Sequence, residues 1–282
     1  MQVGLQPGRA VVLHGPGAVA LLAHLDGTTP RDMLDARGAA AGLDPADVAE
    51  VLARLDAAGL LEVTEPASRP ASAVRLVGTG VLGQLLAELL LTAGVDLHLA
   101  DAGDAAAVAE GGPLPRPRGG PGGRLRTVNH WSKPDGLAVG LSVVAVDTVE
   151  VDRVVTAHLL RTDQPHLVLR SSGSVVTVGP LVLPGRTACL RCTDLARRDA
   201  DPAWPVLLTP LTRLHQPARP VPAAWAASVA ATHVLAHLGG SVPESAGATL
   251  ELDESDHLVR WRAWPLHAAC GCAWSRTTEW GP

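Results

Sequence analysis

Two close pairs of cysteines, far apart in the sequence, constrain this chain more than any other feature. Cys189 and Cys192 stand in "GRTACLRCTDLARRD", and Cys270 and Cys272 stand in "HAACGCAW" near the C-terminus; the chain has four cysteines in all. Each pair offers two thiolates from one short segment, and a zinc ion commonly joins two such segments. The sequence therefore predicts a fold in which these two segments meet at a structural zinc site.

Two other interpretations of the cysteines are two disulfides or four buried thiols without a ligand. Cysteines so close in sequence form strained disulfides, and nothing in the sequence indicates an oxidising compartment. Four thiolates leave no open position on a tetrahedral ion, so the expected metal stabilises the fold and takes no part in chemistry. With the ligand set complete, His267 is expected to support the site or to lie at the surface.

Composition and charge limit the possible partners. The 282 residues are enough for one large or two small domains. The net charge is −5, from 23 basic and 28 acidic side chains, and no basic stripe favours nucleic acid. The N-terminus lacks a signal-peptide pattern, and the Ala-rich segment 221–240 is interpreted as a buried helix, not a membrane span. We therefore expect a cytoplasmic protein without a membrane partner.

Residues 1–66 are predicted to form a small winged-helix-like domain. Residues 10–14, "AVVLH", have the character of a strand, and helical segments follow. The clearest helix is capped by Asp44, ends at Gly59 and is followed by the short apolar run "LLEV". A Pro- and Ser-containing linker is predicted over residues 64–72.

Residues 73–282 are predicted to form an α/β domain that begins as a Rossmann-like unit. Gly78, Gly80 and Gly83 give G-x-G-x-x-G between a predicted strand and a predicted helix. Such glycines allow a tight turn and a close approach to a phosphate at the helix N-terminus, and they also allow the helix to pack on the sheet. Asp101 ends the next predicted strand, where an acidic side chain contacts a ribose hydroxyl in dinucleotide sites.

The remaining sequence continues the alternation of strands and helices. Residues 141–146 and 166–171 read as buried strands, and residues 150–162 read as an amphipathic helix between them. The proline-rich segment 197–222 reads as a loop, and residues 248–264 as a hairpin before the second cysteine pair.

The C-terminal part resembles the E1-like (ThiF-type) adenylyltransferases. This resemblance runs from about Ala73 to Trp274 and rests on "VGTGVLG", Asp101, "VVAVDTVEVDRVV" and the paired cysteines. More specifically, "GRTACLRCTDLARRDADPAWP" and "HAACGC" are similar to the E1-like partner proteins of azole-forming (TOMM) cyclodehydratases. The N-terminal part resembles the PqqD-like domain, a RiPP recognition element that binds leader peptides.

The resemblance implies an ATP-dependent activity that the residues of this chain do not support. Active E1-like enzymes need an Arg and a Lys for the triphosphate and an Asp for magnesium. The stretch after Asp101 lacks an Asn-Leu-x-Arg-Gln-like motif and has only Arg116 and Arg118. At the expected magnesium position Glu150 and Val151 replace an Asp-Asn pair; Glu150 could bind the ion, but Val151 could not. All four cysteines are assigned to zinc. The chain is thus predicted to have a degenerate nucleotide site, with ATP binding doubtful and no catalytic residues.

The function implied is therefore that of an adaptor more than an enzyme. The N-terminal domain would capture the leader of a precursor peptide by strand addition, with Val11, Leu13, Leu55 and Leu61 as candidate lining residues or, equally, as ordinary core. The E1-like domain would dock a separate YcaO-type cyclodehydratase that forms azolines, and E1-like folds often pair into homodimers.

Three alternatives compete with the adaptor. The first is an active E1-like adenylyltransferase whose missing cations come from a partner chain or from the Gly- and Pro-rich loop predicted around residues 110–124. A dinucleotide-dependent oxidoreductase is disfavoured by the cysteine pairs and the N-terminal domain. A DNA-binding regulator is disfavoured because the clearest N-terminal helix carries one arginine, Arg54, among several acidic residues.

Overall fold

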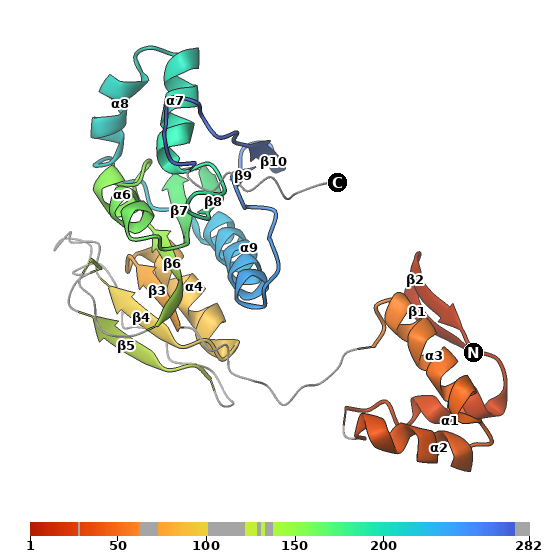
Figure 1. The fold of residues 1–282 in the computed structure, drawn as a ribbon. Helices are drawn as coiled ribbons and strands as arrows, with labels where there is room; N and C mark the ends of the chain where they lie inside the picture. Colours follow the sequence, from red (N-terminus) through yellow and green to blue (C-terminus); the bar gives the residue numbers. More distant parts are fainter. Residues whose placement is uncertain (28, 62–72, 101–121, 129–130, 133–137, 274–282) are drawn as a thin grey trace. The chain divides into compact units, whose positions relative to one another are not determined.

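The chain divides into two compact units, Met1–Ser68 and Arg69–Pro282. The computed structural model describes all residues except 28, 62–72, 101–121, 129–130, 133–137 and 274–282. The two units are therefore described separately (Figure 1).

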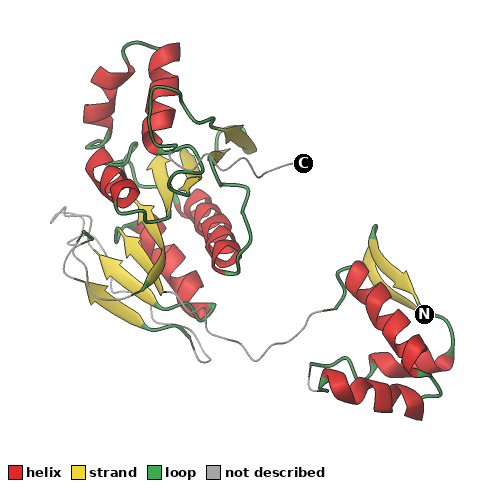
Figure 2. Cartoon of the chain, in the orientation of Figure 1, coloured by secondary structure: helices red, strands yellow, loops and turns green. Residues whose placement is uncertain are grey.

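The N-terminal unit consists of a two-stranded antiparallel sheet followed by short helices (Figure 2). In chain order its elements are β1 (Gln2–Gln6), β2 (Arg9–Val12), α1 (Pro16–Leu22), η1 (Arg31–Met33), α2 (Leu34–Ala40) and α3 (Pro45–Ala57). The predicted cap of α3 is present, because the Asp44 carboxylate accepts a hydrogen bond of 2.8 Å from the N–H of Asp47. Leu60 and Leu61 are outside any strand, and the rest of "LLEV" lies outside the described residues, so the winged helix stays a prediction.

The core of the N-terminal unit is formed where one face of α3 meets the other helices and β2. Its buried members are Val11, Leu13, Ala18, Leu21, Leu34, Val48, Val51, Leu52 and Leu55. The α3 members recur at helical spacing, so the opposite face of α3 is left to polar residues. Burial of this apolar face is the main stabilising contribution available to so small a unit.

The C-terminal unit is built on one eight-stranded mixed sheet. The strand order is β10-β9-β8-β7-β6-β3-β4-β5, with β3 to β7 parallel and the remaining pairs antiparallel. The strands are β3 (Ala73–Val77), β4 (Leu97–Ala100), β5 (Leu125–Val128), β6 (Val139–Ala145), β7 (His166–Ser172), β8 (Val175–Val182), β9 (Ala248–Asp253) and β10 (Leu258–Ala263). The hairpin predicted over residues 248–264 is β9 and β10.

Helices cover both faces of this sheet, as a parallel sheet requires. They are α4 (Val81–Thr92), α6 (Arg153–Arg161), α7 (Leu190–Ala200), α8 (Trp204–Leu211) and α9 (Pro220–Leu238). Helices α4 and α9 pack together against one face, and α6 and the start of α7 pack against the other (Figure 1). Alternate residues of the strands point into the two cores.

Helix α9 is long and apolar enough to cross a membrane, with a mean hydropathy of 1.2. Its small residues instead form a buried stripe against α4 and the sheet, at Ala223, Ala226, Ala227, Ala230 and Ala231. Alanine side chains allow the two helix backbones to approach closely. The length and composition of α9 are therefore those of a core helix.

Two elements differ from the sequence-based expectation. Residues 197–222 were predicted to be a loop, but the segment contains the end of α7 and the whole of α8. Pro205 is tolerated in α8 because it lies in the first turn, where its missing N–H has no helical partner. Helix α6 begins at Arg153 and not at 150, because Asp152 accepts a hydrogen bond from the N–H of Val154 and caps it.

The turn after β3 requires glycine at position 78. Gly78 has a φ of 112°, and a Cβ on it would collide with the carbonyl oxygen of Ala145 in β6. The turn can therefore bring β3 and β6 together only without a side chain here.

Substituting Gly78→Ala should destabilise the C-terminal unit by about 3 kcal/mol, because backbone strain and a steric clash add. Gly94→Ala is the matched control: Gly94 also has a positive φ, but open space surrounds it, so about 1 kcal/mol is expected. Urea unfolding followed by tryptophan fluorescence measures this unit alone, since all seven tryptophans follow residue 73. Equal losses in the two variants would contradict the clash.

Candidate functional site

A cavity of about 800 Å³ opens at the carboxyl ends of β3 and β6. These neighbouring strands lead away to opposite sides of the sheet, which is the point where open α/β sheets bind ligands. The cavity is lined by Val77, Gly78, Thr79, Gly80, Val144, Ala145, Val146, Asp147, Thr148, Val151, Asp152, Arg153, Val155, Leu208, Thr209, Thr212, Arg213 and His215. Apolar walls, threonine hydroxyls and a few charged groups can hold a small molecule of mixed polarity.

The three glycines of the predicted nucleotide motif lie in the turn beside this cavity, and protein contacts account for each. Gly83 lies under the carbonyl of Gly78, and a Cβ at Gly80 would collide with the carboxylate of Asp147. This carboxylate accepts a hydrogen bond of 3.0 Å from the N–H of Val81, in the first turn of α4. The helix N-terminus where a phosphate would bind is therefore already in contact with an acidic side chain. Asp101, Arg116 and Arg118 lie outside the described residues.

Among the described residues, the charged groups around the cavity do not sum to a strongly positive site. Asp147 and Asp152 supply negative charge, while Arg153, Arg213 and His215 supply the basic side chains. Arg213 and His215 are exposed. Arg153 is engaged in ion pairs with Glu150 and Asp194 and is therefore not free to bind a phosphate.

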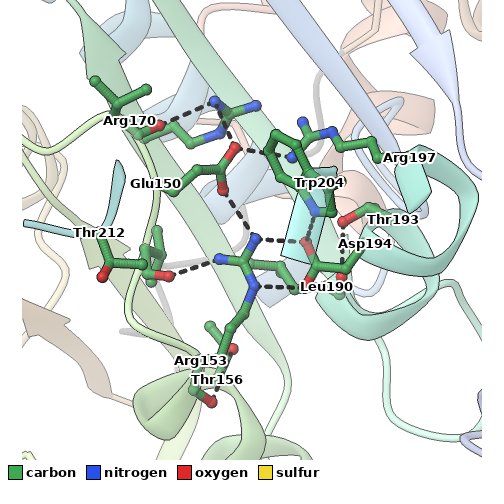
Figure 3. A network of polar contacts seen from close by, with 12 residues as sticks. Glu150, Arg153, Thr156, Arg170, Leu190, Thr193, Asp194, Arg197, Trp204 and Thr212 are labelled. Carbon is green, nitrogen blue, oxygen red and sulfur yellow. Dashed lines mark hydrogen bonds and ion pairs between the residues drawn. The ribbon is translucent and has the colours of Figure 1, made fainter. Parts of the chain in front are cut away.

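Glu150 lies beside this cavity, in the interior, among three arginines (Figure 3). Its carboxylate is 2.9 Å from Nη2 of Arg153, 2.8 Å from Nη1 of Arg197 and 3.2 Å from Nη1 of Arg170. The residue is only 3% exposed. Sequence analysis offered Glu150 as a magnesium ligand, and the structure overturns this interpretation, because both carboxylate oxygens are held by guanidinium groups.

The electrostatics of Glu150 follow from this arrangement. Burial alone would raise the pKa of its carboxyl group, but attraction to Arg170, Arg197 and Arg153 outweighs burial and lowers the pKa below the usual range. Glu150 is therefore ionised at neutral pH. An ionised carboxylate so far from water is stable only while its cationic partners remain in place.

The same arginines connect Glu150 to other elements. Arg153 forms a bidentate pair with Asp194 of α7, at 2.7 and 2.8 Å, and the indole N–H of Trp204 in α8 donates to the same carboxylate. Arg170 of β7 also lies 3.8 Å from the carboxylate of Glu251 in β9. Three arginines thus face three carboxylates, and the cluster joins α6, α7 and α8 to the sheet.

The four cysteines meet in a single buried cluster. Cys189 precedes α7 and Cys192 lies in its first turn, while Cys270 and Cys272 lie after β10. The Sγ atoms are 3.5 Å apart between Cys189 and Cys270, 3.4 Å between Cys192 and Cys272, and 4.0 Å between Cys189 and Cys192. Tetrahedral zinc with bonds of about 2.3 Å places its sulfurs roughly 3.8 Å apart, so this donor set fits such an ion.

The surroundings of the cluster decide which of its thiols ionise. Burial and the neighbouring thiols raise the pKa of Cys272 to about 12 and raise the pKa of Cys270 as well. Burial also acts against ionisation of Cys192, but the backbone N–H of His267 and the thiol of Cys272 outweigh it and lower its pKa. His267 also lies 2.8 Å from Asp199 and so supports the cluster from outside the four cysteines. A metal ion bound here would have to displace the protons of Cys270 and Cys272, so its affinity would depend on pH.

The candidate peptide-binding side chains belong to the core of the N-terminal unit. Val11, Leu13 and Leu55 are buried, and Leu61 is partly buried against the same cluster. The structure therefore favours the core interpretation for the first three side chains.

Sequence analysis missed Asp147 and Arg213 at the cavity and the arginine cluster beside it. Asp147 had a usable signal, since it follows the buried strand next to β3, where ligand groups gather. The arginine cluster had no such sequence signal, because its members come from separate elements. Arg170 lies on a strand, and Arg197 lies on a helix in a segment that was interpreted mainly as a loop.

Comparison with known proteins shows the fold. The sequence matches no family model and no curated protein. Solved structures with a similar fold include E. coli MccB, at 12% identity and a TM-score of 0.62 over 100% of this chain and 97% of that chain. A second structure, of MccB with AMPCPP and MccA, is 14% identical and has a TM-score of 0.64 over 96% of this chain and 94% of that chain. A heterocyclase in complex with substrate and cofactor is 19% identical and has a TM-score of 0.61; the match covers 96% of this chain but 37% of that chain. The predicted E1-like (ThiF-type) fold is confirmed; the PqqD-like resemblance stays a prediction.

The cysteine cluster should bind one zinc ion per chain. Cys192→Ser and Cys272→Ser should each lose the ion and lower the Tm by about 10 °C or more, because binding energy at such a site is folding energy. Metal content by mass spectrometry and calorimetry measure both effects. His267→Ala is the control and should keep its zinc, because only the backbone N–H of His267 contacts a cysteine. A metal-free wild-type protein purified with zinc present would contradict the prediction.

The Glu150→Gln variant should lose about 3 kcal/mol of stability at neutral pH, since three arginines would keep only a neutral partner. The folded pKa of Glu150 is lowered, so its stabilisation is present above the unfolded pKa and is lost as the pH falls through the folded pKa. The gap between wild type and variant should therefore shrink as the pH falls below about 4.5. Urea titrations followed by tryptophan fluorescence at several pH values measure the gap; a constant gap would refute the ionised carboxylate.

Proposed function

We propose that this chain is a peptide-binding adaptor in the biosynthesis of a modified ribosomal peptide. In this proposal the N-terminal unit is a PqqD-like domain that holds the leader of the precursor. The E1-like unit, stabilised by zinc at Cys189, Cys192, Cys270 and Cys272, docks a separate YcaO-type cyclodehydratase. The protein would act in the cytoplasm, and a homodimer is compatible with this role.

The observation that carries the proposal is the engagement of the arginines beside the cavity. Phosphoryl transfer needs oriented cations around the triphosphate. Arg153, Arg170 and Arg197 instead surround the carboxylate of Glu150. In the described part of the chain, the remaining basic side chains of the cavity are Arg213 and His215, which are both exposed. An E1-like fold with this charge distribution is better suited to holding partners than to activating a carboxylate.

The structural neighbours support a role in peptide modification. MccB was solved with the peptide MccA, and the heterocyclase was solved with its substrate. In the described part of the N-terminal unit, β2 pairs with β1 alone, so its other edge could take an extended peptide by strand addition.

One observation favours the alternative of an active adenylyltransferase. MccB was solved with ATP, and the cavity here lies at the carboxyl ends of β3 and β6 with the carboxylate of Asp147 on its wall. If the site binds ATP with magnesium, Asp147 and Asp152 are the carboxylates on the cavity wall that could reach the ion, since Glu150 is engaged.

A single assay distinguishes the adaptor from the adenylyltransferase. The full chain is mixed with ATP, magnesium and synthetic leader segments from short Cys/Ser/Thr-rich reading frames beside its gene. The adaptor should bind one leader, measured by fluorescence anisotropy against a scrambled control, and should release no AMP. Leader-dependent AMP release that is lost in Asp147→Asn would establish the adenylyltransferase instead. Failure to bind any leader would refute the adaptor.

A further inference from the structure

Among the described residues, the edge of β2 that faces away from β1 pairs with no other strand. In the described part of the N-terminal unit the sheet contains only these two strands. The carbonyl of Val12 accepts a hydrogen bond from Arg54 of α3, whereas the N–H of Leu13 bonds to Met1 on the β1 side. Because backbone groups alternate along a strand, Val12 and Ala10 present their N–H and C=O groups on the outer edge.

Two arginines lie at this edge. Nη2 of Arg54 donates to the carbonyl of Val12 at 2.8 Å, and Nη2 of Arg9 donates to the carbonyl of Gly59 at 2.9 Å. Both side chains are exposed, and among the described residues neither guanidinium has a carboxylate within ion-pair distance. The first half of α3, in contrast, carries Asp47 and Glu50.

We propose that the β2 edge binds an extended peptide segment that carries an acidic side chain, and that Arg54 selects for this side chain. The inference rests on the proposed peptide-binding function and specifies its substrate class. An added strand would donate a backbone N–H to the carbonyl of Val12, the acceptor that Arg54 now occupies. The displaced guanidinium then pairs with a carboxylate of the peptide.

The charge distribution along α3 also sets the position of that acidic residue. A carboxylate near Arg54 meets a cation, whereas one near Asp47 or Glu50 meets like charge. Backbone hydrogen bonds along β2 supply affinity for any extended segment. Arg54 therefore contributes selectivity and register more than total affinity.

A phage-displayed library of random twelve-residue peptides, panned on the full chain, tests the inference. Wild type should enrich peptides with an Asp or Glu at one fixed position relative to an apolar pattern. Arg54→Gln should enrich peptides without this acidic bias. Arg37→Gln is the matched control, because Arg37 is an exposed arginine of α2, which packs on the other helices; it should select as wild type does.

A double-mutant cycle measures the pairing. For a selected peptide, Asp→Asn in the peptide and Arg54→Gln in the protein should each weaken binding about three- to fivefold, and the two together should weaken it no further. Circular dichroism and Tm values show whether Arg54→Gln stays folded; Arg54→Lys, which keeps the charge, should retain part of the acidic bias.

The outcomes separate this inference from the function on which it rests. If wild type enriches no peptide over an unrelated protein, both peptide capture and the inference fail. If wild type enriches peptides without an acidic position, or if Arg54→Gln keeps the acidic bias, peptide capture stands and the role of Arg54 is overturned.

Discussion

The ionised carboxylate of Glu150, held in the interior by three arginines, is the interaction on which the C-terminal unit depends. A carboxylate with 3% exposure needs several strong partners, and these come from α6, β7 and α7. Asp194 and Glu251 balance the remaining positive charge. Each of these elements is thereby fixed relative to the loop after β6, which forms one wall of the cavity. The cluster thus fixes the positions of the elements around the carboxyl ends of β3 and β6, where the cavity lies.

This use of charge bears on the functions that an E1-like fold can support. A guanidinium paired with an interior carboxylate attracts a phosphate outside the pair only weakly, because the positive and negative charges nearly cancel at a distance. The cavity retains Asp147 at the N-terminus of α4, where an unscreened helix dipole would otherwise attract an anion. In the described part of this unit, the crevice of an open α/β sheet is present, but the charged side chains that line it do not make it strongly positive.

The parts of the structure that could be predicted from the sequence are those set by local spacing. The glycine turn, the Asp44 cap and the cysteine pairs each need residue types at short intervals, and each is present in the structure. The arginine cluster brings together residues from separate elements, so no local pattern reports it. Helix α8 was missed because its prolines indicate a loop unless their places in the helix are known. Val11 and Leu13 were ambiguous because a binding groove and a core use the same apolar residues.

Helix α7 shows why the metal cluster and the arginine cluster belong together. Leu190, Cys192 and Thr193 are buried in this helix, and Leu195 and Ala196 are partly buried against the same core. Cys192 ties its first turn to the segment after β10, while Asp194 and Arg197, next along the helix, bind Arg153 and Glu150. The cysteine cluster and the ion pairs thus add to apolar burial along this helix. Loss of the contacts within the cysteine cluster should therefore loosen the arginines above the cavity as well, since both depend on the position of α7.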